Sequence, residues 1–169
     1  MNKDKKGLTT FEIERDLGIS RNRLKGWIPK YIKPSLEETR GPGTASRLSK
    51  FDLYRLMLFK HLVERGYKRE SAAKRIKIFR HAVLTRPVTE INLVALIHRG
   101  GGKYLDPNYK CRGRVMRAWG MAYPDLVYGK DMQEIFQDLQ HFDILKNESD
   151  DVIVINFEKI RNAVDAAFK

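Results

Sequence analysis

The sequence predicts a mainly α-helical fold with a small amount of β-structure, in which a basic front half is followed by a back half of different character. Apolar residues of the front half recur at helical spacing between helix caps, and β-branched residues are concentrated after Pro87. Residues 1–86 hold 22 Lys and Arg against 9 Asp and Glu, a net charge of +13. Residues 87–169 hold 11 and 12, a net charge of −1.

This charge distribution favours a polyanionic partner, either nucleic acid or an anionic membrane surface, bound by the front half. A chain of 169 residues suits one domain or two small ones. The single cysteine, Cys111, excludes an intramolecular disulfide. The polar start lacks the apolar core of a secretory signal, and the longest wholly apolar run of about five residues is too short to span a bilayer. We therefore expect a cytoplasmic protein without a membrane partner.

The first predicted helix covers about residues 10–17, in LTTFEIERDLG. Thr9 and Glu12 fit a capping box, and Gly18 is a favourable helix stop. The apolar stripe of this helix is partial and consists of Phe11, Ile13 and Leu17.

A second helix is predicted directly afterwards, in ISRNRLKGWIP. Ser20 is a natural N-cap, and Pro29 is expected to end the helix. Its apolar face is formed by residues at i, i+3 and i+4, namely Leu24, Trp27 and Ile28. Two short helices joined by a tight turn that contains glycine predict a helix-turn-helix.

The segment that follows carries prolines and glycines between short β-prone stretches. Residues 31–33 and 47–49 are predicted to be two strands, joined by an exposed loop at TRGPGTAS, which together would form a two-stranded wing. A helix capped by Ser49 is then expected to run to Gly66, followed by a strongly basic helix over about residues 68–84.

The back half predicts a small α+β domain. INLVALIH is β-rich, RGRVMRAWGMAYPDLVYG predicts a strand or a strand pair, and DDVIVINF predicts a further strand. KDMQEIFQDLQHF predicts a helix, and a closing helix ends the chain. The inward side of the helix in KDMQEIFQDLQHF is expected to carry Met132, Ile135, Phe136 and Leu139.

The front half resembles the winged helix-turn-helix DNA-binding domain of the MerR family of bacterial transcription regulators. The resemblance covers about residues 8–75 through LTTFEIERDLGISRNRLKGWI, YIKPS, SRLSKFDLYRL and LVERGY. Lys25 stands where the family has arginine, Gly26 and Trp27 replace its aromatic pair, and Leu48 replaces an aromatic residue at the end of the wing. The long dimerisation helix of the family is not evident here. The resemblance implies DNA binding, a homodimer and distortion of promoter DNA.

The second helix is the predicted recognition element. With its apolar residues turned inward, Asn22 and Gly26 point away from the core, flanked by Arg23 and Lys25. An amide can pair with adenine, the cations can reach guanine or phosphate, and Gly26 leaves room for close approach of the duplex. The residues expected to contact DNA are Thr10, Ser20, Arg21, Asn22, Arg23, Lys25, Arg40, Thr44, Ser46 and Arg47.

Other motifs favour plain structural interpretations. HRGGGK fails the phosphate-loop pattern, because Ile97 stands where the first glycine should be and Tyr104 follows Lys103. The four histidines lack metal-ligand spacing, and no catalytic constellation stands out. Cys111 lies among basic residues and is most simply an ordinary thiol, with a redox sensor as the alternative. We expect no enzyme activity, no metal and no cofactor.

The sequence thus predicts a winged helix-turn-helix over residues 1–67, a basic connecting helix over 68–86 and a small α+β domain over 87–169 for dimerisation, ligand sensing or partner docking. The expected function is sequence-specific binding of double-stranded DNA by a transcriptional regulator near the nucleoid. The alternative is an architectural DNA-binding module, such as a phage excisionase or a segregation factor.

Overall fold

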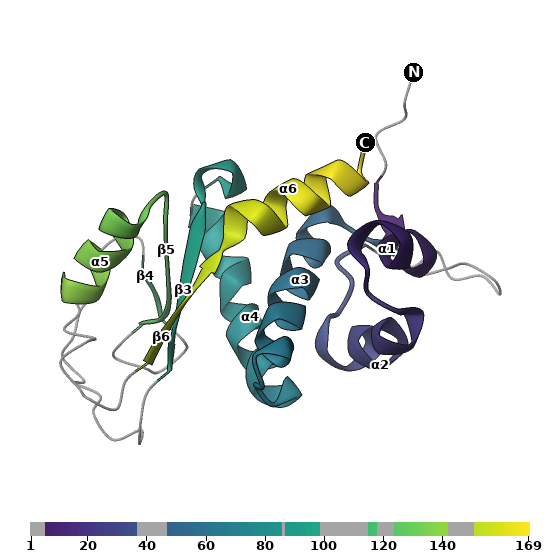
Figure 1. Ribbon diagram of the computed structural model, residues 1–169, viewed down its shortest axis with the longest axis horizontal. Coiled ribbons are helices and arrows are strands. Elements are labelled where there is room, and N and C mark those ends of the chain that lie inside the picture. Colours follow the sequence, from purple (N-terminus) through teal and green to yellow (C-terminus); the bar gives the residue numbers. More distant parts are fainter. Residues whose placement is uncertain (1–5, 37–46, 86, 99–114, 118–123, 142–150) are drawn as a thin grey trace. The chain divides into compact units, whose positions relative to one another are not determined.

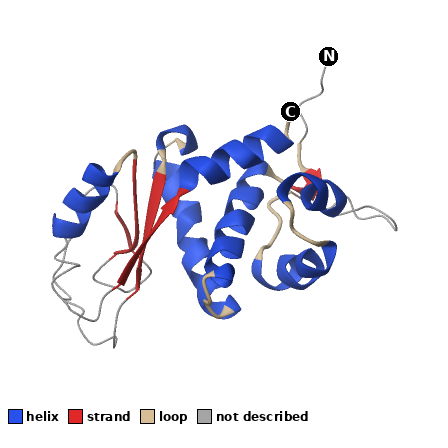
Figure 2. Ribbon diagram, viewed as in Figure 1, coloured by secondary structure: helices blue, strands red, loops and turns tan. Residues whose placement is uncertain are grey.

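The computed structural model describes residues 6–36, 47–85, 87–98, 115–117, 124–141 and 151–169. Helices dominate, and the two sheets are small (Figure 2). The mainly α fold with a small amount of β-structure is therefore confirmed. The chain divides into two compact units, unit 1 with residues 1–73 and 159–169, and unit 2 with residues 74–158. This division differs from the expected one, because the end of the chain belongs to unit 1.

The elements of unit 1 are mostly short helices (Figure 1). They are β1 (Leu8–Thr9), α1 (Thr10–Leu17), α2 (Arg21–Tyr31), β2 (Arg47–Leu48) and α3 (Lys50–Glu64), with the beginning of α4 (Arg69–Thr85) and most of α6 (Phe157–Ala167). β1 pairs antiparallel with β2, with Leu8 opposite Leu48. The fully buried core of this unit includes Leu8, Ile13, Ile19, Leu24, Ile32, Leu48, Leu53, Leu56, Phe59 and Leu62.

Local hydrogen bonds explain where the first two helices begin and end. The Thr9 hydroxyl accepts from the Glu12 backbone N–H at 3.3 Å, and Glu12 Oε2 accepts from the Thr9 N–H at 2.9 Å, which completes the predicted capping box. Gly18 adopts the left-handed conformation with φ 63°, which glycine alone takes without steric cost. Ser20 then caps α2, because its side chain accepts from the Arg23 N–H.

The prediction that Pro29 ends the second helix is wrong. α2 continues through Pro29 to Tyr31, although a proline inside a helix forfeits one hydrogen bond and costs about 3 kcal/mol. The extra turn is held by packing: the Tyr31 ring stacks on Phe59 with 5.4 Å between centroids, and Ile32 is fully buried. Since Tyr31 is helical, the predicted strand at 31–33 is wrong too, and the strand at Arg47–Leu48 pairs with β1 instead.

The prediction that Phe11 lies on the apolar side of α1 is also wrong. Phe11 is 59% exposed, whereas Ile13 and Leu17 are buried. Residues 11 and 13 are about 200° apart around a helix, so both cannot face the same core.

Unit 2 is built on a four-stranded antiparallel sheet, in the order β4-β5-β3-β6. Its further elements are the rest of α4, a 3₁₀ turn η1 (Val88–Glu90) and the helix α5 (Met132–His141). The strands are β3 (Leu93–His98), β4 (Val115–Arg117), β5 (Pro124–Gly129) and β6 (Asp151–Asn156). The segment RGRVMRAWGMAYPDLVYG, predicted to be a strand or a strand pair, contains the two strands β4 and β5.

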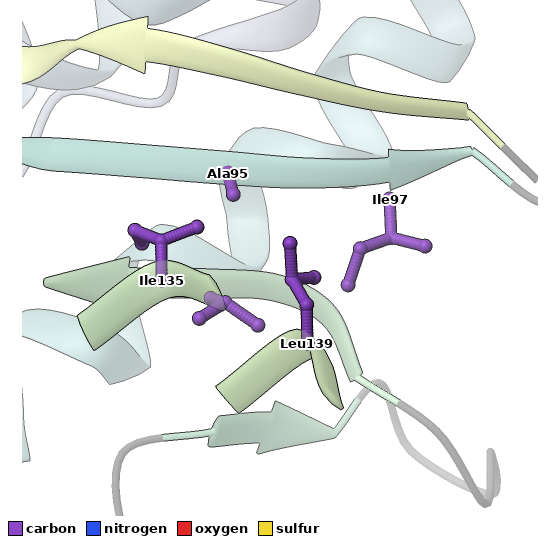
Figure 3. Packing of buried hydrophobic residues seen from close by; sticks show 5 residues of the cluster. Ala95, Ile97, Ile135 and Leu139 are labelled. Atoms are coloured by element: carbon purple, nitrogen blue, oxygen red, sulfur yellow. The ribbon is translucent and has the colours of Figure 1, made fainter. Parts of the chain in front are cut away.

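α5 lies on one face of this sheet (Figure 1). Its Ile135 and Leu139 point toward Ala95 and Ile97 of β3 (Figure 3), and all four side chains are buried. The prediction that Met132 and Phe136 also point inward is wrong, because they are 41% and 47% exposed. Ile135 and Leu139 are only about 40° apart on the helix, so the stripe that reaches the sheet is narrower than the four apolar residues suggest.

α6 returns the end of the chain to unit 1. Its first N–H groups, those of Phe157 and Glu158, donate to the Asn92 carbonyl at 2.8 and 3.0 Å within unit 2. Further along, Asp165 Oδ1 accepts from the Tyr54 hydroxyl at 2.9 Å and lies 2.7 Å from Lys50 Nζ. Burial alone would raise the pKa of Asp165, but these hydrogen bonds outweigh it and lower its pKa below the ordinary value.

The surroundings of His61 in α3 disfavour its protonated form. Its Nε2 is buried and has no hydrogen-bond partner among the described residues. Burial, reinforced by the Arg65 guanidinium, lowers the pKa of His61 below its ordinary value. The folded protein thus binds this proton less readily than the unfolded chain, and protonation of His61 favours unfolding.

We therefore predict that thermal stability, measured by circular dichroism, falls more steeply in the wild type than in His61→Gln as the pH drops from about 7.5 to about 5.5. The contribution of neutral His61 is complete above its unfolded pKa of about 6.5 and is lost as the pH falls through the lower folded-state pKa. Parallel pH profiles for the two proteins would contradict this assignment.

Candidate nucleic-acid interface

α2 has one buried side and one exposed polar side. Leu24, Trp27 and Ile28 are at most 7% exposed, as their spacing predicts. Trp27 meets the Phe59 ring edge-on at 5.1 Å between centroids, which fixes the rotation of the helix about its axis. The exposed residues of the opposite side are Ser20, Arg21, Asn22, Arg23, Lys25 and Gly26. The predicted orientation of the helix is therefore confirmed.

Three cations of α2 are paired with carboxylates from other helices of unit 1. Arg21 Nε lies 2.8 Å from Glu14 of α1, Arg23 Nη1 lies 3.4 Å from Glu64 of α3, and Lys30 Nζ lies 3.8 Å from Glu70 of α4. Exposed pairs of this kind contribute only about 0–1 kcal/mol each to stability. Lys25 has no ion pair within the described part of the chain.

Tyr31 links the end of α2 to Glu70. Its hydroxyl donates to Glu70 Oε1 at 2.8 Å, and this hydrogen bond lowers the pKa of Glu70 below its ordinary value. The Glu70 carboxylate therefore stays ionised beside Lys30, where it holds the last turn of the helix in place.

Gly26 lies in the middle of the exposed side of α2, where no close neighbour among the described residues requires a glycine. A Cβ atom built there would meet no atom of the described residues within 4 Å, and the φ of Gly26 is not in the left-handed region. Glycine inside a helix costs about 0.5–1 kcal/mol relative to alanine. Packing within the described part of the chain therefore does not explain this unfavourable residue.

Arg47 is the first residue of β2 and lies opposite Thr9 of β1. It is exposed, and its Nη1 donates to the Gly7 carbonyl at 3.4 Å. Glycine is required at position 7, because a Cβ there would lie 2.7 Å from both Leu36 Cδ1 and the Leu48 carbonyl oxygen. Thr10 is half-buried as the first residue of α1. Among the other predicted contact residues, Arg40, Thr44 and Ser46 lie outside the described residues.

The Asp52 carboxylate joins the segment after α2 to the start of α3. Its Oδ2 accepts from the Ser35 N–H and hydroxyl at 2.8 Å each, and from the Ser49 N–H and hydroxyl at 3.1 and 2.8 Å. Arg55 Nη1 lies 3.6 Å from Oδ1 and donates to the Lys33 carbonyl at 3.4 Å. Asp52 is fully buried, and the hydrogen bonds from these partners offset the cost of removing its carboxylate from water.

Sequence reasoning missed two side chains beside α2. Glu14 accepts from Arg21 although seven residues and a turn separate them, and Phe11 lies exposed beside the same arginine, with Arg21 Cζ 5.8 Å from the ring centroid. A glutamate one turn before a glycine stop, followed by an arginine at the first position of the next helix, is the signal that could have identified the first contact.

Several other predictions fall on parts of the chain outside the description. Cys111 and the GGGK segment are among them. Within the described ranges, no helix is long and apolar enough to cross a membrane. The same residues contain no group of three or more His, Cys, Asp or Glu that could hold a metal ion.

Comparison with known proteins gives no further information about this site. No protein-family model matches the chain, and no curated protein is significantly similar to it. The exposed side of α2 presents an amide, several cations and a stretch of accessible helix backbone, groups that can contact phosphate oxygens and base edges.

Replacing Asp52 with alanine is predicted to destabilise the protein by about 3–5 kcal/mol, because the Arg55 charge and the Ser35 donors lose their buried partner. Unfolding by urea, followed by circular dichroism, measures this change. Asp16→Ala is the matched control, since its carboxylate pairs with Arg15 at the surface and its loss should cost less than about 1 kcal/mol. Equal losses of unfolding free energy in the two variants would show that the buried hydrogen bonds of Asp52 stabilise the protein no more than an exposed ion pair does.

Proposed function

We propose that this chain binds double-stranded DNA sequence-specifically through α2, as a transcriptional regulator with a winged helix-turn-helix in unit 1. The observation that carries the proposal is the two-sided helix: α2 buries Trp27 and exposes Asn22, Arg23 and Lys25, in the half of the chain that holds a net charge of +13. The Gly18 turn between α1 and α2 gives the tight connection that a helix-turn-helix requires.

In this proposal α2 enters the major groove. Asn22 and the neighbouring cations would contact base edges, and Ser20 and Arg21 would contact phosphates beside them. Arg47, with the preceding Arg40, Thr44 and Ser46, would contact the flanking DNA backbone from the segment between α2 and α3, in place of the predicted strand pair. Thr10 would do so from the start of α1. Such phosphate contacts position the protein, whereas base contacts supply the specificity.

The remaining parts of the proposal concern assembly. A homodimer would place two copies of α2 on a two-fold symmetric operator, and unit 2, most of which lies after the strongly basic half, would mediate dimerisation or the binding of a ligand or protein partner. Distortion of promoter DNA would add recognition of DNA shape. The protein would act in the cytoplasm on the nucleoid and without enzyme activity of its own.

The direct test is the double variant Arg23→Ala with Lys25→Ala. Two lost contacts of about 1–2 kcal/mol each should weaken binding to the selected site by roughly 30- to 700-fold without unfolding the protein. Genomic fragments retained by the protein supply the site, and fluorescence anisotropy measures the affinity. Wild-type affinity should fall steeply with salt, with a lower slope in the variant.

The matched control is Lys130→Ala with Lys169→Ala, which removes the same charge from two exposed positions outside α2. This control should bind within a few-fold of the wild type. Unaltered binding by the α2 variant, or equal losses in both variants, would reject α2 as the contact element. Footprinting adds the biological distinction: one short palindrome at a promoter supports a regulator, whereas tandem arrays or bent recombination sites favour an architectural module.

Gly26→Ala separates stability from binding. Alanine should stabilise α2 by about 0.5–1 kcal/mol, since its Cβ meets nothing and the unfolded chain loses less entropy on folding. The same Cβ should weaken duplex binding if the helix backbone lies against the DNA at this point. Thermal unfolding and anisotropy measure the two effects, and a variant that is both more stable and equally tight would exclude close approach at Gly26.

A further inference from the structure

Arg21 is held by α1 more completely than the other cations of α2 are held by their partners. Glu14 Oε1 accepts from the Arg21 backbone N–H at 3.0 Å, and Glu14 Oε2 accepts from Arg21 Nε at 2.8 Å. The same carboxylate thus satisfies a free N–H group at the start of α2 and fixes the guanidinium of that residue. The Arg21 and Glu14 side chains are 57% and 37% exposed, so the pair lies at the surface.

An exposed aromatic ring completes this arrangement. Arg21 Cζ lies 5.8 Å from the centroid of the Phe11 ring, within the range of a cation–π contact. With Nε bound to Glu14, the Nη1 and Nη2 groups have no hydrogen bond within the described residues. These two groups form the edge of the guanidinium that binds a phosphate by two parallel hydrogen bonds.

We propose that Glu14, supported by Phe11, is a positioning residue that holds Arg21 in the orientation needed to bind a DNA phosphate. An acidic residue then strengthens binding to a polyanion. The inference rests on the proposed DNA-binding function and adds to it the identity of a contact and of the residue that prepares it. Its physical basis is preorganisation, since a fixed arginine loses less rotational freedom on binding.

Simple electrostatics makes the opposite prediction. At physiological salt the screening length is about 8 Å, so a carboxylate next to the contact arginine should repel the approaching phosphates. Removal of the Glu14 charge should then tighten binding. If Glu14 orients Arg21, removal of its charge weakens DNA binding, and if Glu14 repels the phosphates, removal of its charge strengthens binding. The direction of the change in affinity therefore decides between the two effects.

Glu64 provides the matched control, because it stands beside another arginine of the same helix. It approaches Arg23 by a single contact of 3.4 Å, both side chains are about half exposed, and it accepts no backbone N–H of α2 in the described structure. Glu64→Gln removes the same charge as Glu14→Gln without removing a fixed orientation. Repulsion alone predicts equal effects for the two variants.

The experiment measures the affinity of the full-length protein for its selected duplex by fluorescence anisotropy. Glu14→Gln should weaken binding about 3- to 10-fold, since the amide oxygen can replace only one of two charged hydrogen bonds. Glu64→Gln should bind as tightly as the wild type or up to about 3-fold more tightly. Phe11→Leu, which keeps an apolar side chain but removes the ring, should weaken binding about 2- to 5-fold.

The variant Arg21→Ala distinguishes positioning from a merely structural role. In that background Glu14→Gln should no longer weaken binding, because no guanidinium remains to be held. A loss of affinity that persists without the Arg21 side chain would mean that Glu14 acts only by capping α2, and would overturn the inference. Tighter binding by Glu14→Gln in the otherwise wild-type protein, or unchanged binding by Arg21→Ala, would overturn it too.

Failure of the proposed function has a different signature. A wild-type protein without salt-dependent duplex binding rejects DNA binding itself, and the inference with it. A wild type that binds, together with a Glu14→Gln variant that binds at least as tightly, rejects the inference alone.

Discussion

The fully buried carboxylate of Asp52 holds the start of α3 and the segment that leaves α2 in one place. It accepts four hydrogen bonds from Ser35 and Ser49, and Arg55 lies beside its second oxygen. α3 in turn carries Phe59, against which the rings of α2 pack. The rotation of α2, and with it the exposure of its polar side, therefore depends on a scaffold fixed by one buried charge and its donors.

Short-range chemistry explains what the sequence could predict. A capping box joins residues three apart, as Thr9 does with Glu12, and this geometry is local enough to infer from the sequence. Pro29 shows the limit of such reasoning. Its local preference is to end the helix, but Phe59, thirty residues further on, packs on Tyr31 and makes another turn favourable. The fold of α2 was thus predictable from its own residues, except where tertiary packing outweighed them.

The candidate site was predictable to the same extent. The spacing of the apolar residues was enough to predict the exposed and buried sides of α2, because side chains repeat around a helix with a fixed period. Spacing could not give the partners of the cations, since Glu14, Glu64 and Glu70 come from three other helices. Nor could it give the return of α6 to unit 1, which depends on Asp165 meeting Tyr54 across 111 positions. Contacts of this kind leave no periodic signal in a single sequence.

The Glu14 carboxylate orders the arginine at the start of α2. Unpaired arginines would sample many rotamers, and each would lose that freedom when a ligand orders it. A carboxylate that holds an arginine in one orientation reduces this loss of rotamer entropy. The exposed ion pair itself contributes little energy, and the phosphate must still reach the edge of the guanidinium that the carboxylate leaves exposed. Arg21 satisfies this condition most completely, since Glu14 binds Nε and the backbone N–H and leaves the outer nitrogens accessible. Together with the exposed backbone at Gly26, this preorganisation of Arg21 is the physical basis of the proposed binding of DNA by α2.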